Sequence, residues 1–259
     1  MVGTLPSARP LGRAGHRGVR AFRAAARCRR RSRDDAAGSS HAPSQVCQSG
    51  RMSSAANFTA GPHGAERTKD QLRVEARARR TGRSSKARVS AAAGIADRAA
   101  ELLEARADGV TCVAAYASRP AEPGTAPLLD LLDQRGVRVL LPVLGPGLAR
   151  GWAEYADADD LAVRAPGRPP EPSGPASEAE ALGAAAVVFA PALGVDDAGI
   201  RLGQGGGWYD RALHHAAPDA LVVAVVFDDE VHDDALPREE HDVPVHAVLT
   251  PSSWWLVPR

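Results

Sequence analysis

The chain has 259 residues, of which 44% are hydrophobic and 24% charged, with a net charge of +1. This length supports one substantial hydrophobic core or two small ones, and it excludes a peptide hormone or a collagen. The longest uninterrupted apolar run covers only eight residues, 220–227. A bilayer-spanning helix requires roughly 20, so we expect no membrane-spanning segment.

Three cysteines, Cys28, Cys47 and Cys112, are too few for a disulfide framework, and none stands in a Cys-x-x-Cys arrangement. The eight histidines include one adjacent pair, His214 and His215, without the companion ligands of a structural zinc site. This cysteine usage is typical of a reducing compartment, and we expect a cytoplasmic protein.

The balanced charge conceals a basic N-terminus. Residues 1–51 hold eleven arginines, no lysine and only two acidic residues. Apolar residues are too sparse in this region to order it, so we expect a disordered basic extension over residues 1–65. A targeting segment and a nucleic-acid-binding tail are two interpretations. A misassigned start is the third, with Met52 as the alternative. The 30 arginines against two lysines indicate GC-rich coding, so the clustering of arginines carries less information about function than usual.

From residue 66 the pattern predicts alternating helices and strands. Two helices, 66–80 and 85–106, open this region. Buried strands are predicted at 110–116, 137–141, 185–189, 221–227 and 246–249, with helices at 128–134, 177–182 and 208–215. A short hairpin is expected around residues 152–155. We therefore expect a single α/β domain over residues 66–259, with a mostly parallel sheet covered on both faces.

The most informative segment runs from Asp196 to Arg211, ahead of a predicted helix. Its glycines allow positive φ angles and close approach to a ligand, and amides at the helix start would point toward an anion. Arg201 and Arg211 add positive charge, and Asp210 could hold a metal-bound water. The segment suits a nucleotide polyphosphate with magnesium, although it lacks the Gly-Lys-Ser/Thr of a Walker A loop. Glycine content alone favours a flexible turn over a phosphate site.

Residues 199–211, GIRLGQGGGWYDR, resemble the signature G-x-R-L-G-x-G-x-G-(aromatic)-Y-D of the 5-formyltetrahydrofolate cyclo-ligases. Residues 69–73 are similar to the K-x-x-L-R of that family's first helix, and residues 116–125 to its Y-x(5)-E-x-x-T segment. Further similarities, in the family's order, are Leu141-Pro142, Glu171-Pro172, Pro191, Pro237, His241-Asp242 and Leu249-Thr250. The resemblance covers residues 66–251 and implies a three-layer α/β/α domain of the NagB/RpiA/CoA-transferase type.

The resemblance implies ATP-dependent cyclisation of 5-formyltetrahydrofolate to 5,10-methenyltetrahydrofolate, with ADP and phosphate released through a phosphorylated formyl intermediate. Arg201 and Tyr209 would be catalytic, and Glu122 and Tyr209 would bind the folate. Asp210 and Asp242 would serve Mg²⁺. The implied ATP-binding residues are Lys69, Arg73, Arg201, Gly203, Gln204, Gly205, Gly206, Gly207, Trp208, Tyr209, Asp210 and Arg211. We expect a monomer that binds neither membranes nor nucleic acid.

Each of these residues also has a structural interpretation. Lys69 and Arg73 could form a solvated helical stripe, and Glu122 could be a loop charge. Tyr209 could only pack, Asp210 could favour its helix start, and Asp242 could make an Asx-turn. Trp152 and Tyr155 could line the pterin pocket or pack in the core.

Two alternative functions stay open on the sequence. Four positions depart from the family pattern, Ala192, Val195, Gln204 and Trp208, and they permit a paralogue that uses the same ATP loop on a non-folate substrate. The basic N-terminus permits a nucleotide- or nucleic-acid-binding regulator.

Overall fold

The computed structural model describes residues 67–106, 109–145 and 149–258. By its internal contacts the chain divides into Met1–Phe58 and Thr59–Arg259, and every described residue lies in the second unit. The basic extension predicted over residues 1–65 lies outside the described residues. Within them, no helix combines the length and the apolar composition needed to cross a bilayer.

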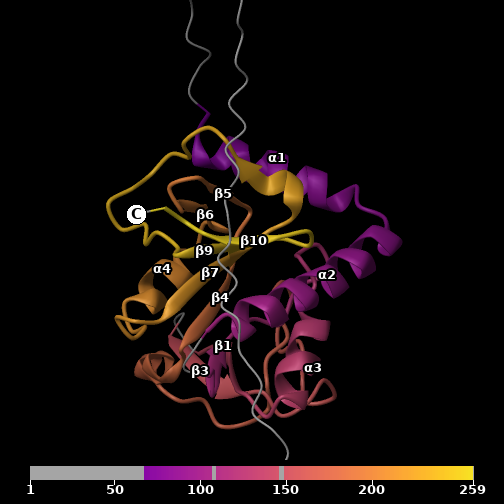
Figure 1. Cartoon of the computed structure of the whole chain (residues 1–259), viewed down its shortest axis with the longest axis vertical. Coiled ribbons are helices and arrows are strands. Elements are labelled where there is room, and N and C mark those ends of the chain that lie inside the picture. Colours follow the sequence, from indigo (N-terminus) through magenta and orange to yellow (C-terminus); the bar gives the residue numbers. More distant parts are fainter. Residues whose placement is uncertain (1–66, 107–108, 146–148, 259) are drawn as a thin grey trace, which may run out of the picture. The chain divides into compact units, whose positions relative to one another are not determined.

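Seven strands form the main sheet, which Figure 1 shows from one side. They are β1 (Cys112–Ala114), β2 (Arg138–Leu144), β3 (Arg150–Glu154), β4 (Val187–Pro191), β7 (Leu221–Val225), β9 (Ala247–Leu249) and β10 (Trp254–Leu256). Their order is β10-β9-β7-β4-β1-β2-β3. The five inner strands are parallel, and the edge strands β3 and β10 pair antiparallel. The predicted α/β fold with a mostly parallel sheet is confirmed.

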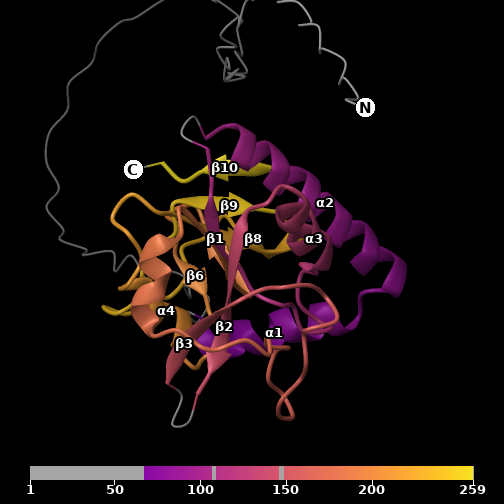
Figure 2. The ribbon, with the colours of Figure 1, turned by 90° about the horizontal axis from the view of Figure 1, so that it is seen from below.

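The inner strands are buried on both faces because their apolar residues alternate between two core clusters. Val113, Val187 and Val223 pack in one cluster with residues of α2 (Ser85–Glu104) and α3 (Ala126–Gln134). Ala114, Val188 and Val222 pack in the other with residues of η2 (Ala179–Ala184) and α4 (Trp208–Leu213). In Figure 2, α2 and α3 accordingly lie on the opposite side of the strands from α4. Continuous apolar runs in these strands follow from this two-sided burial.

The first helix, α1 (Lys69–Thr81), begins at a capping box. The Thr68 hydroxyl accepts the backbone N–H of Gln71, and the Gln71 side chain accepts the backbone N–H of Thr68. This pair satisfies two N–H groups at the helix start, so the helix begins three residues later than the predicted Glu66. The second helix keeps its predicted start at Ser85, behind the N-cap Ser84, and ends at Glu104.

A second, three-stranded sheet was not predicted. It consists of β5 (Gly194–Asp196), β6 (Arg201–Leu202) and β8 (Val231–His232) in the order β6-β5-β8. Leu72 and Ala76 of α1 pack with apolar residues of this region in a small separate core that includes Leu193, Ile200, Leu202 and Leu236. This packing fixes α1 beside the segment that leads into the glycine-rich loop.

Two further expectations differ in detail. The hairpin expected around residues 152–155 is larger than predicted, because β3, which contains Trp152, pairs antiparallel with the preceding strand β2 along five residue pairs. The predicted helix at 177–182 is a short 3₁₀ helix, η2. The short η3 (Asp228–Glu230) follows β7 and ends where β8 begins.

Candidate active site

The order in which the chain adds strands to the main sheet reverses at β1, and the candidate site lies beside this point. The chain passes from β1 to β2 on one side, and β4 then pairs on the other side of β1. Such a switch point leaves a crevice at the carboxyl ends of the two strands, where open α/β sheets bind ligands. A cavity of about 240 Å³ occupies this position, lined by residues at or just after the carboxyl ends of β1, β2 and β4, among them Tyr116, Leu144 and Pro191.

The glycine-rich loop, residues 203–207, forms one wall of this cavity between β6 and α4. Gly205 has a φ angle of 105° and Gly207 one of 57°, values that L-residues rarely adopt. Arginines hold three carbonyls of the loop. Arg73 Nε donates to Gly203 O at 3.0 Å, Arg77 Nη2 to Gln204 O at 2.9 Å and Arg211 Nη2 to Gly206 O at 2.7 Å. Two of these arginines come from α1, so the helix and the loop are directly joined.

Arg201 and Asp210 form a buried ion pair at the two ends of this loop. Arg201 Nη2 lies 2.6 Å from Asp210 Oδ1, and the side chains are 3% and 15% exposed. Arg201 also donates to the carbonyl of Val243. Burial lowers the pKa of Arg201, and the negative charge of Asp210 acts against this shift. The pair places a guanidinium on the cavity wall with its orientation fixed.

Lys69 and Asp242 form a second pair outside the main cavity. Lys69 Nζ lies 2.7 Å from Asp242 Oδ2 and 3.1 Å from a carboxylate oxygen of Glu239. Burial alone would lower the pKa of Lys69, but the hydrogen bonds and charges of the two carboxylates raise it overall. For Asp242, burial acts to raise the pKa and the bond with Lys69 lowers it, with a net lowering. Lys69 and Arg73 line a separate hollow at the start of α1.

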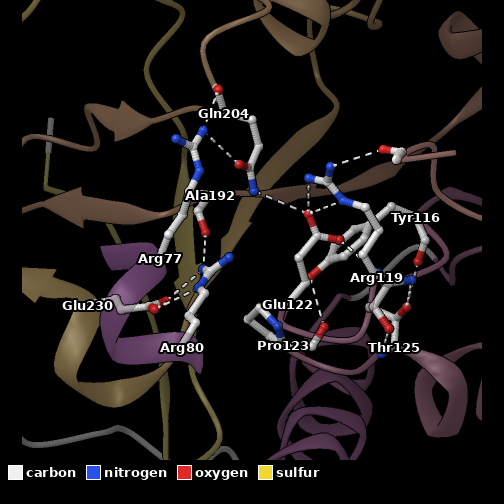
Figure 3. A network of polar contacts seen from close by, with 12 residues as sticks. Arg77, Arg80, Tyr116, Arg119, Glu122, Pro123, Thr125, Ala192, Gln204 and Glu230 are labelled. Atoms are coloured by element: carbon white, nitrogen blue, oxygen red, sulfur yellow. Dashed lines mark hydrogen bonds and ion pairs between the residues drawn. The ribbon is translucent and has the colours of Figure 1, made fainter. Parts of the chain in front are cut away.

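Glu122 also lines the cavity and is 8% exposed. The loop that presents it is fixed by Thr125, whose hydroxyl donates to Tyr116 O at 2.6 Å and accepts the Ser118 N–H at 3.1 Å. Arg119 donates to Glu122 Oε1 through Nη2 at 2.6 Å and Nε at 3.1 Å. Figure 3 shows this pair together with the amide of Gln204, which approaches Glu122 from the glycine-rich loop.

Three aromatic side chains stack toward the cavity. The ring centroids of Trp152 and Trp208 lie 5.3 Å apart, and those of Trp208 and Tyr209 4.9 Å apart, both edge to face. Trp208 and Tyr209 line the cavity, whereas Trp152 is fully buried behind them. The Tyr209 hydroxyl is buried and makes no hydrogen bond within the described residues. Burial, followed by the charge of Glu122, raises the pKa of Tyr209 well above its ordinary value.

The two carboxylates predicted to serve a metal, Asp210 and Asp242, belong to no ready-made metal cluster among the described residues. No group of three or more His, Cys, Asp or Glu side chains in the described part of the chain could hold a metal ion. Asp210 and Asp242 instead each pair with a cation. Mg²⁺ often takes only one or two protein carboxylates and completes its shell with water and substrate phosphates. The residues therefore fit a Mg²⁺ that is bound together with a nucleotide.

The structure divides the predicted site residues between three places. Glu122, Arg201, Gly203, Gln204, Gly206, Gly207, Trp208, Tyr209 and Asp210 line the main cavity. Lys69 and Arg73 line the hollow at α1. Gly205, Arg211 and Asp242 line neither, although Arg211 and Asp242 are tied to the site by the contacts above. Tyr155 packs against the core cluster of α2 and α3 rather than lining the cavity.

Three arginines at the site were not predicted, namely Arg77, Arg119 and Arg168. Arg168 lines the cavity and donates to Leu144 O at 2.7 Å. Arg119 stands three residues before Glu122, a spacing that could have indicated the pair. No comparable signal marks Arg77 or Arg168, because arginine is abundant throughout this chain.

The family model described as "5-formyltetrahydrofolate cyclo-ligase family" matches residues 65–251. The chain belongs to the 5-formyltetrahydrofolate cyclo-ligase family. A relative of that name from Mycolicibacterium smegmatis is 47% identical over 144 residues, which cover 54% of this chain and 73% of the relative. One from Escherichia coli, also called 5-formyltetrahydrofolate cyclo-ligase, is 34% identical over 152 residues, covering 55% of this chain and 79% of the relative.

Two solved structures of 5,10-methenyltetrahydrofolate synthetases share the fold of this cyclo-ligase family member. The one from Aquifex aeolicus has a TM-score of 0.59 at 24% identity, covering 74% of this chain and 93% of its own. The one from Mycoplasma pneumoniae has a TM-score of 0.56 at 15% identity, covering 71% of this chain and 98% of its own. At these identities the two structures bear on the fold alone.

Proposed function

We propose that this chain catalyses the ATP-dependent cyclisation of 5-formyltetrahydrofolate to 5,10-methenyltetrahydrofolate, with release of ADP and phosphate. The observation that carries the proposal is that the family's signature loop and Glu122 line one cavity at the switch point of the sheet. A nucleotide held by the loop and a folate held by Glu122 would therefore meet in the same space.

The nucleotide side of the site supplies positive charge. Phosphoryl transfer depends on positioning and on neutralising charge spread over the phosphate oxygens, rather than on a strong protein base. Arg201 is suited to this role because Asp210 fixes its orientation on the cavity wall. We propose that Lys69 and Arg73 approach the phosphates from α1 and that the loop glycines allow close backbone contact.

We propose that Asp210 and Asp242 hold a Mg²⁺ ion that arrives with ATP. When bound, this ion would neutralise phosphate charge and orient the transferred group. Each carboxylate would then be shared between the ion and its present partner, Arg201 or Lys69.

On the folate side of the site, Glu122 and Tyr209 would bind the substrate. A carboxylate suits the amino and ring N–H donors of a pterin, and Glu122 is buried enough to make such bonds selective. Tyr209 would donate its hydroxyl hydrogen bond to the formyl group as charge develops there. The formyl oxygen attacks the γ-phosphorus and ADP leaves. Nitrogen 10 then attacks the formyl carbon and loses its proton, and the carbon–oxygen bond breaks as phosphate departs.

The finer structural assignments belong to the same proposal. We propose that residues 66–259 form the catalytic domain as a three-layer α/β/α unit of the NagB/RpiA/CoA-transferase type, acting as a cytoplasmic monomer. Core clusters on both faces of the main sheet support the layering. The low cysteine content supports a reducing compartment.

The test follows absorbance at the methenyl-folate band with the full chain, 5-formyltetrahydrofolate, Mg²⁺ and ATP, omitting each in turn. A rise that requires every component supports the reaction, and no rise from a folded, ATP-binding protein refutes it. Glu122→Ala should abolish the rise and leave ATP binding intact. Glu104→Ala is a matched control, because Glu104 lies on α2 with 67% of its side chain exposed.

A further inference from the structure

Gln204 carries the only side chain in the glycine-rich loop, since every other residue from 203 to 207 is glycine. Its backbone carbonyl accepts Arg77 Nη2 at 2.9 Å, and its side-chain oxygen accepts the same nitrogen at 3.4 Å. Its amide nitrogen donates to Glu122 Oε1 at 3.2 Å. The Gln204 side chain therefore joins the glycine-rich loop directly to Glu122.

The carboxylate of Glu122 is held on both oxygens. Oε1 accepts Gln204 and the two guanidinium nitrogens of Arg119. Oε2 accepts the backbone N–H of Arg119 at 2.9 Å, which uses one of its two lone pairs. The bonds on Oε1 thus orient the carboxylate so that the second lone pair of Oε2 can receive a ligand donor. Without Gln204, one of these orienting bonds would be lost.

These contacts form one polar chain, Arg77–Gln204–Glu122–Arg119, across α1, the glycine-rich loop and the loop after β1 (Figure 3). We infer that Gln204 is a positioning residue that couples the nucleotide loop to the folate carboxylate, so that nucleotide binding strengthens folate binding and the reverse. The inference rests on the proposed function, because it takes the nucleotide to lie on the loop and the folate on Glu122.

The expected coupling is positive for an entropic reason. Three arginines hold carbonyls of the loop, but its four glycines leave the backbone freer than other residues would, so we take part of the unliganded population to lack the Gln204–Glu122 bond. Phosphates bound to the loop would restrict it to the bonded arrangement. A folate that binds next would then find Glu122 already oriented and would bear less of the ordering cost. Linkage requires the same factor in both directions.

The experiment measures binding by calorimetry on the full chain, with 5-formyltetrahydrofolate and a non-hydrolysable ATP analogue with Mg²⁺. In the wild type, saturating analogue should tighten the Kd of 5-formyltetrahydrofolate by about five-fold or more, and saturating folate should tighten the Kd of the analogue equally. Gln204→Met keeps the length of the side chain but lacks the amide. It should reduce the coupling factor to below about two-fold, with the Kd of the analogue alone within about three-fold of wild type.

Two further variants distinguish a loss of coupling between the two ligands from a simple loss of folate affinity. Arg119→Met removes the orienting bonds on the far side of Glu122, so it should weaken folate binding about ten-fold with and without the analogue and keep the coupling factor. Arg77→Met releases the loop from the exposed face of α1 and should lower the coupling factor without touching Glu122. This last variant keeps the inference testable even where Gln204→Met folds poorly.

The outcomes are distinct. The absence of coupling in the wild type, or coupling retained in a folded Gln204→Met variant, overturns the inference. Where that variant does not fold, coupling retained in Arg77→Met overturns it. So does a Gln204→Met variant whose loss of affinity is confined to the ATP analogue, because Gln204 would then serve the nucleotide alone. Failure of the wild type to form methenyl product overturns the proposed function instead, and the inference with it. Normal turnover with coupling unchanged in Gln204→Met overturns the inference alone.

Discussion

The guanidinium of Arg80 makes two hydrogen bonds to the carboxylate of Glu230, at 2.7 and 2.8 Å, and both side chains are almost completely buried. Arg80 also donates to the carbonyl of Ala192, and Glu230 accepts the backbone N–H of Phe227 at 3.0 Å. The pair thus fastens the end of α1 to the segments after β4 and β7. Because α1 carries the arginines that hold the glycine-rich loop, this contact indirectly supports the site.

Arg80→Met should lower the free energy of unfolding by about 3–5 kcal/mol, because it leaves a buried carboxylate without its counter-ion. The double variant Arg80→Met/Glu230→Gln should recover at least half of this loss, since the neutral amide still accepts from Phe227. Urea unfolding measures both. Arg138→Met is the control. Arg138 pairs with Glu154 at the surface, where an ion pair contributes about 0–1 kcal/mol. An equal effect at Arg80 and Arg138 would contradict the prediction.

The Lys69–Asp242 pair predicts a defined pH dependence of stability. The folded-state pKa of Asp242 is lowered, so its contribution is present above its ordinary value of 3.8 and is lost as pH falls through the folded pKa. The pKa of Lys69 is raised, so its contribution is present below 10.5 and is lost as pH rises through the folded value. Between these limits both groups stabilise the folded chain.

Asp242→Asn should therefore lower the Tm at pH 7 by roughly 2–4 °C, which corresponds to about 1 kcal/mol in a domain of this size. The difference from wild type should shrink as pH falls below 3.8 towards the lowered pKa of the folded state, because the carboxylate of the unfolded chain takes up its proton first. Thermal melts followed by circular dichroism over a pH series check this. A Tm difference that stays constant down to acid pH would show that the carboxylate charge is not responsible.

Local patterns in the sequence predict much of this fold. The inner parallel strands were predicted because each is a β-branched or apolar run buried on both faces, as Val187 and Val188 illustrate by packing in opposite clusters. The small sheet was missed because β6 and β8 have two residues each, too few for any periodicity. The charged pattern predicts a start of α1 at Glu66, three residues too early, although Thr68 and Gln71 carry a capping-box signal.

The same contrast holds for the candidate site: residues close together in the sequence identify part of it, and contacts between residues far apart in the chain form the rest. The signature at residues 199–211 is a run of adjacent residues, so the sequence alone predicts the glycine-rich loop. The contacts that organise the loop join residues far apart in the chain, such as Arg77 with Gln204 and Gln204 with Glu122. The packing of α1 against the small sheet and the position of the switch point bring these residues together. Neither can be predicted from a short stretch of sequence.

Gly205 should be sensitive to substitution because of its backbone, not its surroundings. Its φ angle is 105°, and an added Cβ would meet Arg73 only at ordinary contact distance, 3.7 Å. Gly205→Ala should therefore cost about 1–3 kcal/mol of unfolding free energy through backbone strain. Gly206→Ala is the matched control, since Gly206 has open space around its Cβ position and no positive φ. Similar denaturant midpoints for the two variants would contradict the strain.

Removing the Tyr209 hydroxyl should lower activity without lowering stability. Its hydroxyl is buried without a hydrogen-bond partner among the described residues, an arrangement that costs roughly 1–3 kcal/mol of desolvation. Burial raises the pKa of Tyr209 well above its ordinary value, so the group stays a neutral hydroxyl at neutral and mildly alkaline pH. It is thus suited to donate a hydrogen bond to the substrate and unsuited to act as a base.

Tyr209→Phe should leave the Tm unchanged or raise it, because only an unpartnered polar atom is removed, while kcat falls about 10- to 100-fold through loss of a donor to the reacting group. Tyr116→Phe is the control for stability. The Tyr116 hydroxyl donates to Pro123 O at 3.2 Å, and its removal should cost about 1 kcal/mol. Thermal melts and initial rates on both variants make the comparison. A Tyr209→Phe variant with wild-type kcat would assign Tyr209 to packing alone, and one with a lower Tm would show that its hydroxyl is already bonded in the free protein.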